Sequence, residues 1–111
     1  MQQLPVASLH AFIRGAAGSR PVLLDVREPW ELALARLDLP GTPTVHIPIN
    51  DLPGRLDELD PAQPILALCH HGMRSMHCVA YLLQQGYADV YNVAGGIDAW
   101  SIQVDPSVPR Y

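Results

Sequence analysis

The amino-acid sequence predicts an α/β protein in which a mainly parallel sheet is covered by helices on both faces. Continuous apolar runs that suit strands buried on both faces occur at residues 21–26 and 63–69. Segments with helical spacing alternate with the strands, which is the order of a three-layer α/β/α fold. The length of 111 residues suits a single domain over residues 1–111, since no repeat or linker divides the chain.

The first part of the chain predicts a helix, a strand and a second helix. Residues 6–18, VASLHAFIRGAAG, have the apolar spacing of a short amphipathic helix that ends on Gly18. The run PVLLDV at 21–26 contains β-branched residues and predicts a buried strand. Residues 27–37, REPWELALARL, have helical spacing again, with Pro29 near the start of the helix, where proline is tolerated.

The middle of the chain contains shorter elements. PGTP at 40–43 predicts a loop, and TVHIPI at 44–49 predicts a short strand that Pro48 limits. Residues 51–60, DLPGRLDELD, indicate a short helix or a turn.

The last part of the chain repeats the strand and helix order. QPILALC at 63–69 predicts a second buried strand, and SMHCVAYLLQQG at 75–86 predicts a helix closed by Gly86. DVYNVAGG at 89–96 predicts a strand that runs into a glycine turn, and IDAWS at 97–101 begins a last helical turn.

The composition is that of a globular protein, with 49% apolar residues. The formal net charge is 7 − 11 = −4, so we expect neither nucleic acid nor an anionic membrane as a partner. All seven cationic side chains are arginine. The two cysteines, Cys69 and Cys78, are too few for a disulfide scaffold. No signal peptide or membrane-length apolar stretch is visible, so we expect a cytoplasmic location.

The most informative stretch is ILALCHHGMRS, residues 65–75, where a strand ends at Cys69. Ligands of parallel sheets bind at the carboxyl ends of the strands, and the free amides of the following helix attract anions. A cysteine at this position is favoured as the thiolate, which is the nucleophilic form. Gly72 allows the loop to curl into an anion-binding nest, Arg74 adds a permanent charge, and Ser75 is expected to cap the helix.

The other cysteine and the histidines have simpler interpretations. Cys78 lies among apolar residues of the helix at 75–86, which predicts a buried structural thiol. His70, His71 and His77 do not have zinc-ligand spacing, so no metal site is predicted. We expect His70 and His71 to line the mouth of the loop.

The loop CHHGMRS resembles the active-site loop C-x-x-G-x-R-[ST] of the rhodanese sulfurtransferase family. LLDVREPWEL at 23–32 resembles the family's first signature, and VYNVAGGIDAW at 90–100 resembles its closing signature. The resemblance covers residues 4–103 and leaves a proline-broken tail at 104–111. LPGTPTVHIPIN at 39–50 departs from the family's usual spacing in a connecting loop.

This resemblance implies a rhodanese-like fold with a five-stranded, mainly parallel sheet. It also implies sulfur transfer without a cofactor or metal. The cysteine takes a sulfane sulfur from thiosulfate or a persulfide and becomes a persulfide itself. It then passes this sulfur to cyanide, a thiol or a protein acceptor. Mapped onto this chain, Cys69 is the sulfur carrier, and Asp25 and Arg27 support the loop. The residues expected to form the substrate cradle are His70, His71, Gly72, Met73, Arg74 and Ser75.

Two alternative functions belong to other classes. Phosphatases and arsenate reductases of similar fold use a loop one residue longer, C-x5-R, whereas Cys69 and Arg74 give C-x4-R. A non-catalytic rhodanese-like module would not need this cysteine. The composition does not decide between a monomer and a dimer, and the physiological donor and acceptor stay open.

Overall fold

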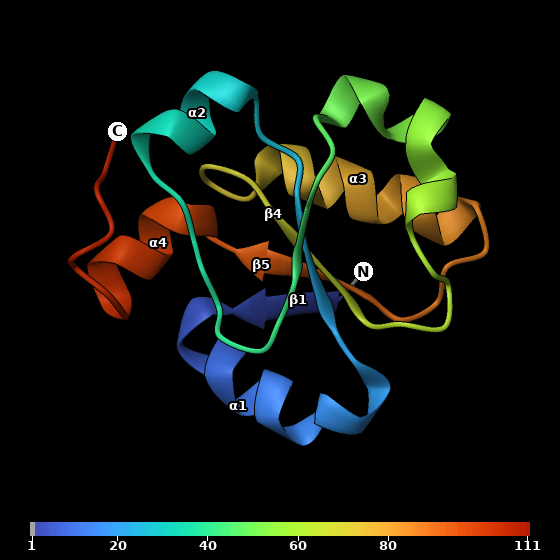
Figure 1. Cartoon of the computed structure of the whole chain (residues 1–111), viewed down its shortest axis with the longest axis horizontal. Helices are drawn as coiled ribbons and strands as arrows, with labels where there is room; N and C mark the ends of the chain where they lie inside the picture. Colours follow the sequence, from blue (N-terminus) through green and yellow to red (C-terminus); the bar gives the residue numbers. More distant parts are fainter. Residues whose placement is uncertain (1) are drawn as a thin grey trace.

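The computed structural model describes residues 2–111 and contains a five-stranded sheet in the order β1-β5-β4-β2-β3 (Figure 1). All four pairings between these strands are parallel. This confirms the α/β prediction, and the sheet that was predicted as mainly parallel is entirely parallel. The strands are β1 (Gln2–Pro5), β2 (Val22–Asp25), β3 (Thr44–His46), β4 (Ile65–Leu68) and β5 (Val90–Ala94).

Strand β1 is the one strand that the residue pattern did not predict. It lies at the edge of the sheet beside β5, with Leu4 opposite Val93. Within β1 only Leu4 is buried, so the segment has neither a continuous apolar run nor a clear alternation. The five-strand count, which only the family resemblance implied, is confirmed.

Strands β2 and β4 are buried along their whole lengths, as their apolar runs predicted. Alternate side chains of each strand enter different hydrophobic clusters, because successive side chains of a strand point to opposite faces. Leu24 and Ala67 join the cluster beneath α3 (Met73–Gln84). Leu23 joins the cluster that also contains residues of α1 (Leu9–Gly15) and α4 (Gly96–Gln103).

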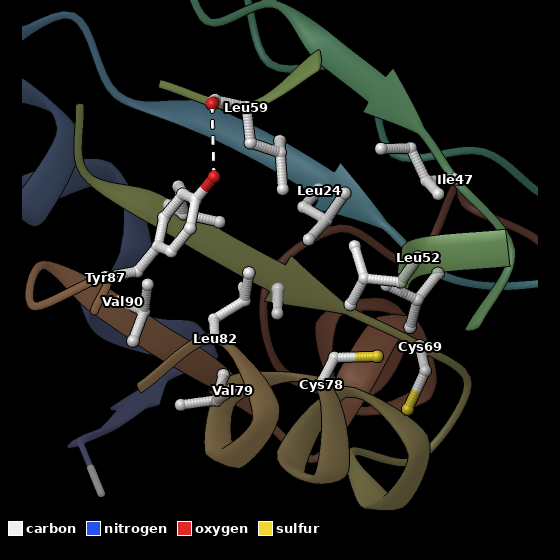
Figure 2. Close-up of a cluster of buried hydrophobic side chains, with 13 residues drawn as sticks. Leu24, Ile47, Leu52, Leu59, Cys69, Cys78, Val79, Leu82, Tyr87 and Val90 are labelled. Carbon is white, nitrogen blue, oxygen red and sulfur yellow. Dashed lines mark hydrogen bonds between the residues drawn. The ribbon is translucent and has the colours of Figure 1, made fainter. Parts of the chain in front are cut away.

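The cluster beneath α3 reaches from Tyr87 to the two cysteines (Figure 2). At one end the Tyr87 hydroxyl donates a hydrogen bond to the Leu59 carbonyl oxygen at 3.3 Å. At the other end Cys69 and Cys78 lie beside Leu52, which comes from the 3-10 segment η3 (Ile49–Glu58). Both thiols are therefore part of the apolar interior.

The helices are shorter than the sequence pattern predicted in two places. Helix α1 spans Leu9–Gly15, with the 3-10 turns η1 (Val6–Ser8) and η2 (Ala17–Ser19) on either side, so the predicted end at Gly18 is wrong. Helix α2 spans Pro29–Leu34 and not 27–37.

The early end of α2 has a tertiary cause. Ala35 has an extended backbone, with φ −158° and ψ 138°, although its sequence surroundings favour a helix. The extended chain that follows places Ala35, Leu37 and Leu39 in the hydrophobic cluster on the α1 side of the sheet. The segment favours a helix, but helix propensity contributes little free energy per residue, and burial of these side chains outweighs it.

Helices α3 and α4 (Gly96–Gln103) begin just after β4 and β5 respectively, at the same edge of the sheet. Figure 1 shows the loops that follow β4 and β5 near each other at this edge. The chain after α4 then folds back, and Val104, Val108 and Tyr111 pack against the cluster on the α1 side. No helix among residues 2–111 is long and apolar enough to cross a membrane.

Candidate functional site

Cys69 directly follows β4, and hydrogen-bond donors converge on its sulfur atom. The Gly72 amide lies 3.1 Å and the Ser75 amide 3.4 Å from Sγ, and the Ser75 hydroxyl lies at 3.3 Å. These groups stabilise negative charge on the sulfur, because an anionic acceptor strengthens each bond. The structure thus brings Gly72 and Ser75, two of the six residues expected to form the cradle, into contact with the sulfur of Cys69.

Ser75 has a different local role from the one predicted. Helix α3 begins at Met73 and its N-cap position is Gly72, so Ser75 lies inside the first turn and does not cap the helix. Its hydroxyl contacts Cys69 Sγ and lies 2.5 Å from Asn92 Oδ1. Because a hydroxyl carries one hydrogen, it can serve only one of these acceptors at a time. Ser75 thus donates either to Cys69 Sγ or to Asn92 Oδ1.

Asn92, which the sequence analysis did not single out, fixes this serine and the loop. Its amide nitrogen donates to the Gly72 carbonyl at 3.1 Å and to Gln3 Oε1 at 3.0 Å, so its oxygen is left facing Ser75. The available signal was a polar residue in the middle of a buried strand, since such residues need hydrogen-bond partners.

The glycine turn at 95–96 explains the closing motif of the sequence. The first amides of α4 bind the carbonyls of the cysteine loop: Ile97 donates to Cys69 at 3.0 Å and Asp98 to His70 at 3.1 Å. Gly96 has φ +65°, and a Cβ at this position would collide with those same two carbonyl oxygens. A side chain at Gly96 would therefore push the loop away from α4.

Arg74 lies beside the loop but is already paired with a carboxylate. Its guanidinium makes a two-pronged contact with Glu31, at 2.6 and 2.8 Å. This contact with Arg74, together with weaker hydrogen bonding from Tyr111 and Glu28, lowers the pKa of Glu31 to about 2. The Arg74 side chain is 34% exposed, so solvent still reaches it within this ion pair. A direct role toward an anionic donor stays a prediction.

Asp25 and Arg27 form a second ion pair, which is buried. Arg27 Nη2 lies 2.8 Å from Asp25 Oδ2, and the Arg27 side chain has no exposed surface. The Arg27 carbonyl accepts a hydrogen bond of 2.6 Å from His46 Nε2, which requires the hydrogen of that imidazole to be on Nε2. Arg27 has no open path to a ligand, so its place agrees with a supporting role.

His70 and His71 follow Cys69 directly in the loop. Their rings stack at 3.9 Å, and His70 also stacks on Tyr111 at 3.8 Å. Burial, followed by the neighbouring His71, lowers the pKa of His70 below its ordinary value, which favours the neutral imidazole. Met73 is exposed nearby.

A metal is not assigned to this pair of histidines. Ligand atoms of His70, His71 and Asp98 lie within 4.8 Å of one another. However, the lone pairs of two stacked rings run side by side and do not converge on one point, and Asp98 is already held by Arg110 at 2.8 Å.

Cys78 contrasts with Cys69 in its surroundings. Burial, and then the charge of Cys69, raises the pKa of Cys78 to about 12. Its thiol faces the apolar cluster in Figure 2 and is kept protonated. This agrees with the structural role predicted for it.

A family model described as the Rhodanese-like domain matches residues 8–103 of the chain. The chain belongs to the rhodanese-like family. This confirms the resemblance based on the cysteine loop and the two flanking motifs.

Individual relatives agree with this assignment. The rhodanese-like/PpiC domain-containing protein 12, chloroplastic, of Arabidopsis thaliana is 41% identical over 93 residues, which is 80% of this chain. This rhodanese-like chain spans 30% of the length of that relative. A rhodanese-related protein from Thermoplasma volcanium superposes with a TM-score of 0.78 and 29% identity, covering 100% of both chains.

A further solved structure is a NAD-dependent persulfide reductase from A. fulgidus. It matches 90% of this rhodanese-like chain and 16% of its own chain, with a TM-score of 0.70 and 29% identity. The shared part is therefore a small portion of a much larger protein.

Proposed function

We propose that this rhodanese-like domain is a sulfurtransferase that carries a sulfane sulfur as a persulfide on Cys69. The observation that supports this most is the convergence of the Gly72 amide, the Ser75 amide and the Ser75 hydroxyl on the sulfur atom. The same donors that stabilise a thiolate suit the outer sulfur of a persulfide, which is also anionic.

The proposed reaction consists of two displacements. In the first, the Cys69 thiolate attacks the sulfane sulfur of thiosulfate; a sulfur–sulfur bond forms, the donor's bond breaks, and sulfite leaves with the electron pair. In the second, a nucleophilic acceptor attacks the outer sulfur and the Cys69 thiolate leaves. The two steps balance without an added oxidant or reductant, and they form a ping-pong scheme.

The proposed donor is thiosulfate or a persulfide, and the proposed acceptor is cyanide, a small thiol or a protein thiol. The word persulfide in the name of the A. fulgidus reductase supports the persulfide as a donor, although this chain matches only 16% of that protein. Both cysteines of this chain are free, which suits a reducing compartment such as the cytoplasm.

The phosphatase alternative requires space for a tetrahedral oxyanion above the sulfur. Here the Gly72 amide lies 3.1 Å from Sγ, and the C-x4-R loop is one residue shorter than a C-x5-R loop. An assay with a generic aryl phosphate separates the two functions. Cys69-dependent turnover of that phosphate would contradict the sulfurtransferase proposal.

Intact-protein mass spectrometry after incubation with thiosulfate tests the proposal directly. We expect a gain of one sulfur atom in the wild type, loss of that sulfur on addition of cyanide, and no gain in Cys69→Ser. Cys78→Ser is the matched control and should still gain the sulfur. A wild type that gains no sulfur from thiosulfate or from a small persulfide would favour a non-catalytic binding module.

A further inference from the structure

The chain after α4 returns to the cysteine loop and ends with Tyr111 beside it. Val104 and Val108 pack against the hydrophobic cluster on the α1 side of the sheet and hold this segment in place. The sequence predicted only a proline-broken tail here. In the structure Tyr111 instead contacts the cysteine loop and the two ion pairs beside it.

The phenol of Tyr111 lies between the two ion pairs of the site. Arg27 Nη1 donates to its oxygen at 3.1 Å, and the phenol lies 2.7 Å from Glu31 Oε2. A guanidinium can only donate, so the single hydrogen of the phenol must point to Glu31. The contacts form one chain from Asp25 through Arg27, Tyr111 and Glu31 to Arg74.

The ring of Tyr111 supports the first histidine of the loop. It stacks on His70 with ring centroids 3.8 Å apart and an interplanar angle of 10°. His71 covers the other side of His70. His70 is thus held between two rings, and one of them, Tyr111, lies outside all three motifs of the family resemblance.

We propose that Tyr111 is a positioning residue of the cysteine loop: its hydroxyl holds Glu31, and through it Arg74, while its ring holds His70 beside Cys69. What the positioned loop binds rests on the proposed sulfurtransferase function. Tyr111 contacts no reacting atom, so it acts only through these neighbours. The chemistry that depends on it is the binding of an anionic sulfur donor near Arg74.

The hydroxyl half of this proposal is tested with Tyr111→Phe, which keeps the ring and removes the hydrogen bond to Glu31 together with the one accepted from Arg27. We expect KM for thiosulfate to rise about 2- to 10-fold with little change in kcat, since loss of one hydrogen bond has effects of this size. Tyr91→Phe is the matched control, because it removes a hydroxyl that bonds to Asp89 at 2.6 Å. A wild-type KM in Tyr111→Phe would overturn the proposal.

The ring half is tested by NMR titration of His70 in Tyr111→Ala and Tyr111→Phe. In the wild type, burial lowers the pKa of His70 first and His71 second, while Asp98, Glu31 and a hydrogen bond with the Tyr111 backbone, which both variants keep, oppose this. Tyr111→Ala uncovers one face of His70, so its pKa should rise toward the ordinary value, whereas Tyr111→Phe should leave it in place. A wild-type titration curve in Tyr111→Ala would overturn the placement of the ring.

The two tests keep this proposal separate from the proposed function. The NMR titration involves no sulfur transfer, so it decides the contact between Tyr111 and His70 even for an inactive wild type. If the wild type accepts no sulfur, the sulfurtransferase proposal fails, and the titration still supports or overturns the positioning role.

Discussion

At the scale of single residues, Cys69 and Cys78 have the same exposure and different chemistry. Each is 1% exposed, so static access does not separate them. Cys69 receives two amide hydrogen bonds, whereas burial raises the pKa of Cys78 to about 12. We expect iodoacetamide at pH 7 to alkylate Cys69 much faster than Cys78, as followed by peptide mass spectrometry. Equal rates would contradict a stabilised thiolate at Cys69.

Arg74 has two possible effects that a single substitution mixes. Arg74→Ala removes a permanent charge from the loop, and we expect kcat/KM for thiosulfate to fall by an amount equivalent to about 1–3 kcal/mol. It also leaves the buried Glu31 unpaired, which lowers stability.

The double variant Arg74→Ala/Glu31→Gln separates these effects of Arg74. Removal of the orphaned charge should restore much of the unfolding free energy, measured in urea, without restoring thiosulfate use. Unchanged thiosulfate kinetics in Arg74→Ala would mean that the ion pair with Glu31 is the whole role of Arg74.

At the scale of elements, the glycine turn before α4 determines the position of the cysteine loop. Gly96→Ala would place a Cβ against the carbonyls of Cys69 and His70, at a φ of +65°. We expect a loss of more than about 1 kcal/mol of stability and slower alkylation of Cys69, because the loop must move. Gly15→Ala is the control, since its added Cβ would meet no atom within 4 Å apart from its chain neighbours and the backbone of its own helix. Wild-type stability in Gly96→Ala would show that the cysteine loop can move away from the added Cβ without a loss of unfolding free energy.

The same scale shows what the sequence could predict. Strands β2 and β4 were predictable, because each is a buried apolar run of the kind that parallel sheets contain. Strand β1 and the end of α2 were not, since both depend on packing with distant residues: Leu4 beside Val93, and Ala35 in the cluster on the α1 side of the sheet. Local pattern carries no information about such partners.

The candidate site divides in the same way. Cys69, Gly72 and Arg74 follow from one continuous stretch, so the motif locates them. Asn92 and Tyr111, which hold the loop, are 17 residues or more away along the chain from Ser75 and His70, the loop residues that they contact. Only the fold reveals that these side chains meet, because ordinary hydrogen bonds between distant residues leave no spacing signal.

At the scale of the whole molecule, the Glu31–Arg74 pair makes the free energy of unfolding depend on pH. Arg74 lowers the pKa of Glu31 from 4.5 to about 2 in the folded protein. A carboxyl with a depressed folded pKa stabilises the protein at a pH above its unfolded pKa, and that contribution is lost as the pH falls through the folded pKa. The free energy of unfolding should therefore fall between about pH 5 and pH 2.

Comparison of Glu31→Gln with the wild type isolates this contribution, since glutamine does not titrate. The difference in unfolding free energy should be largest near pH 6, on the order of 2 kcal/mol, and should shrink steadily toward pH 2. Glu58→Gln is the matched control: Glu58 pairs with Arg55 at 2.6 Å in solvent, so its substitution should change stability little at any pH. Urea unfolding at several pH values measures both variants. A Glu31→Gln difference that stays constant from pH 6 to pH 2 would mean that the carboxylate is not held by Arg74 in solution, and the chain of contacts from Asp25 to Arg74 would lose its last contact, the one between Glu31 and Arg74.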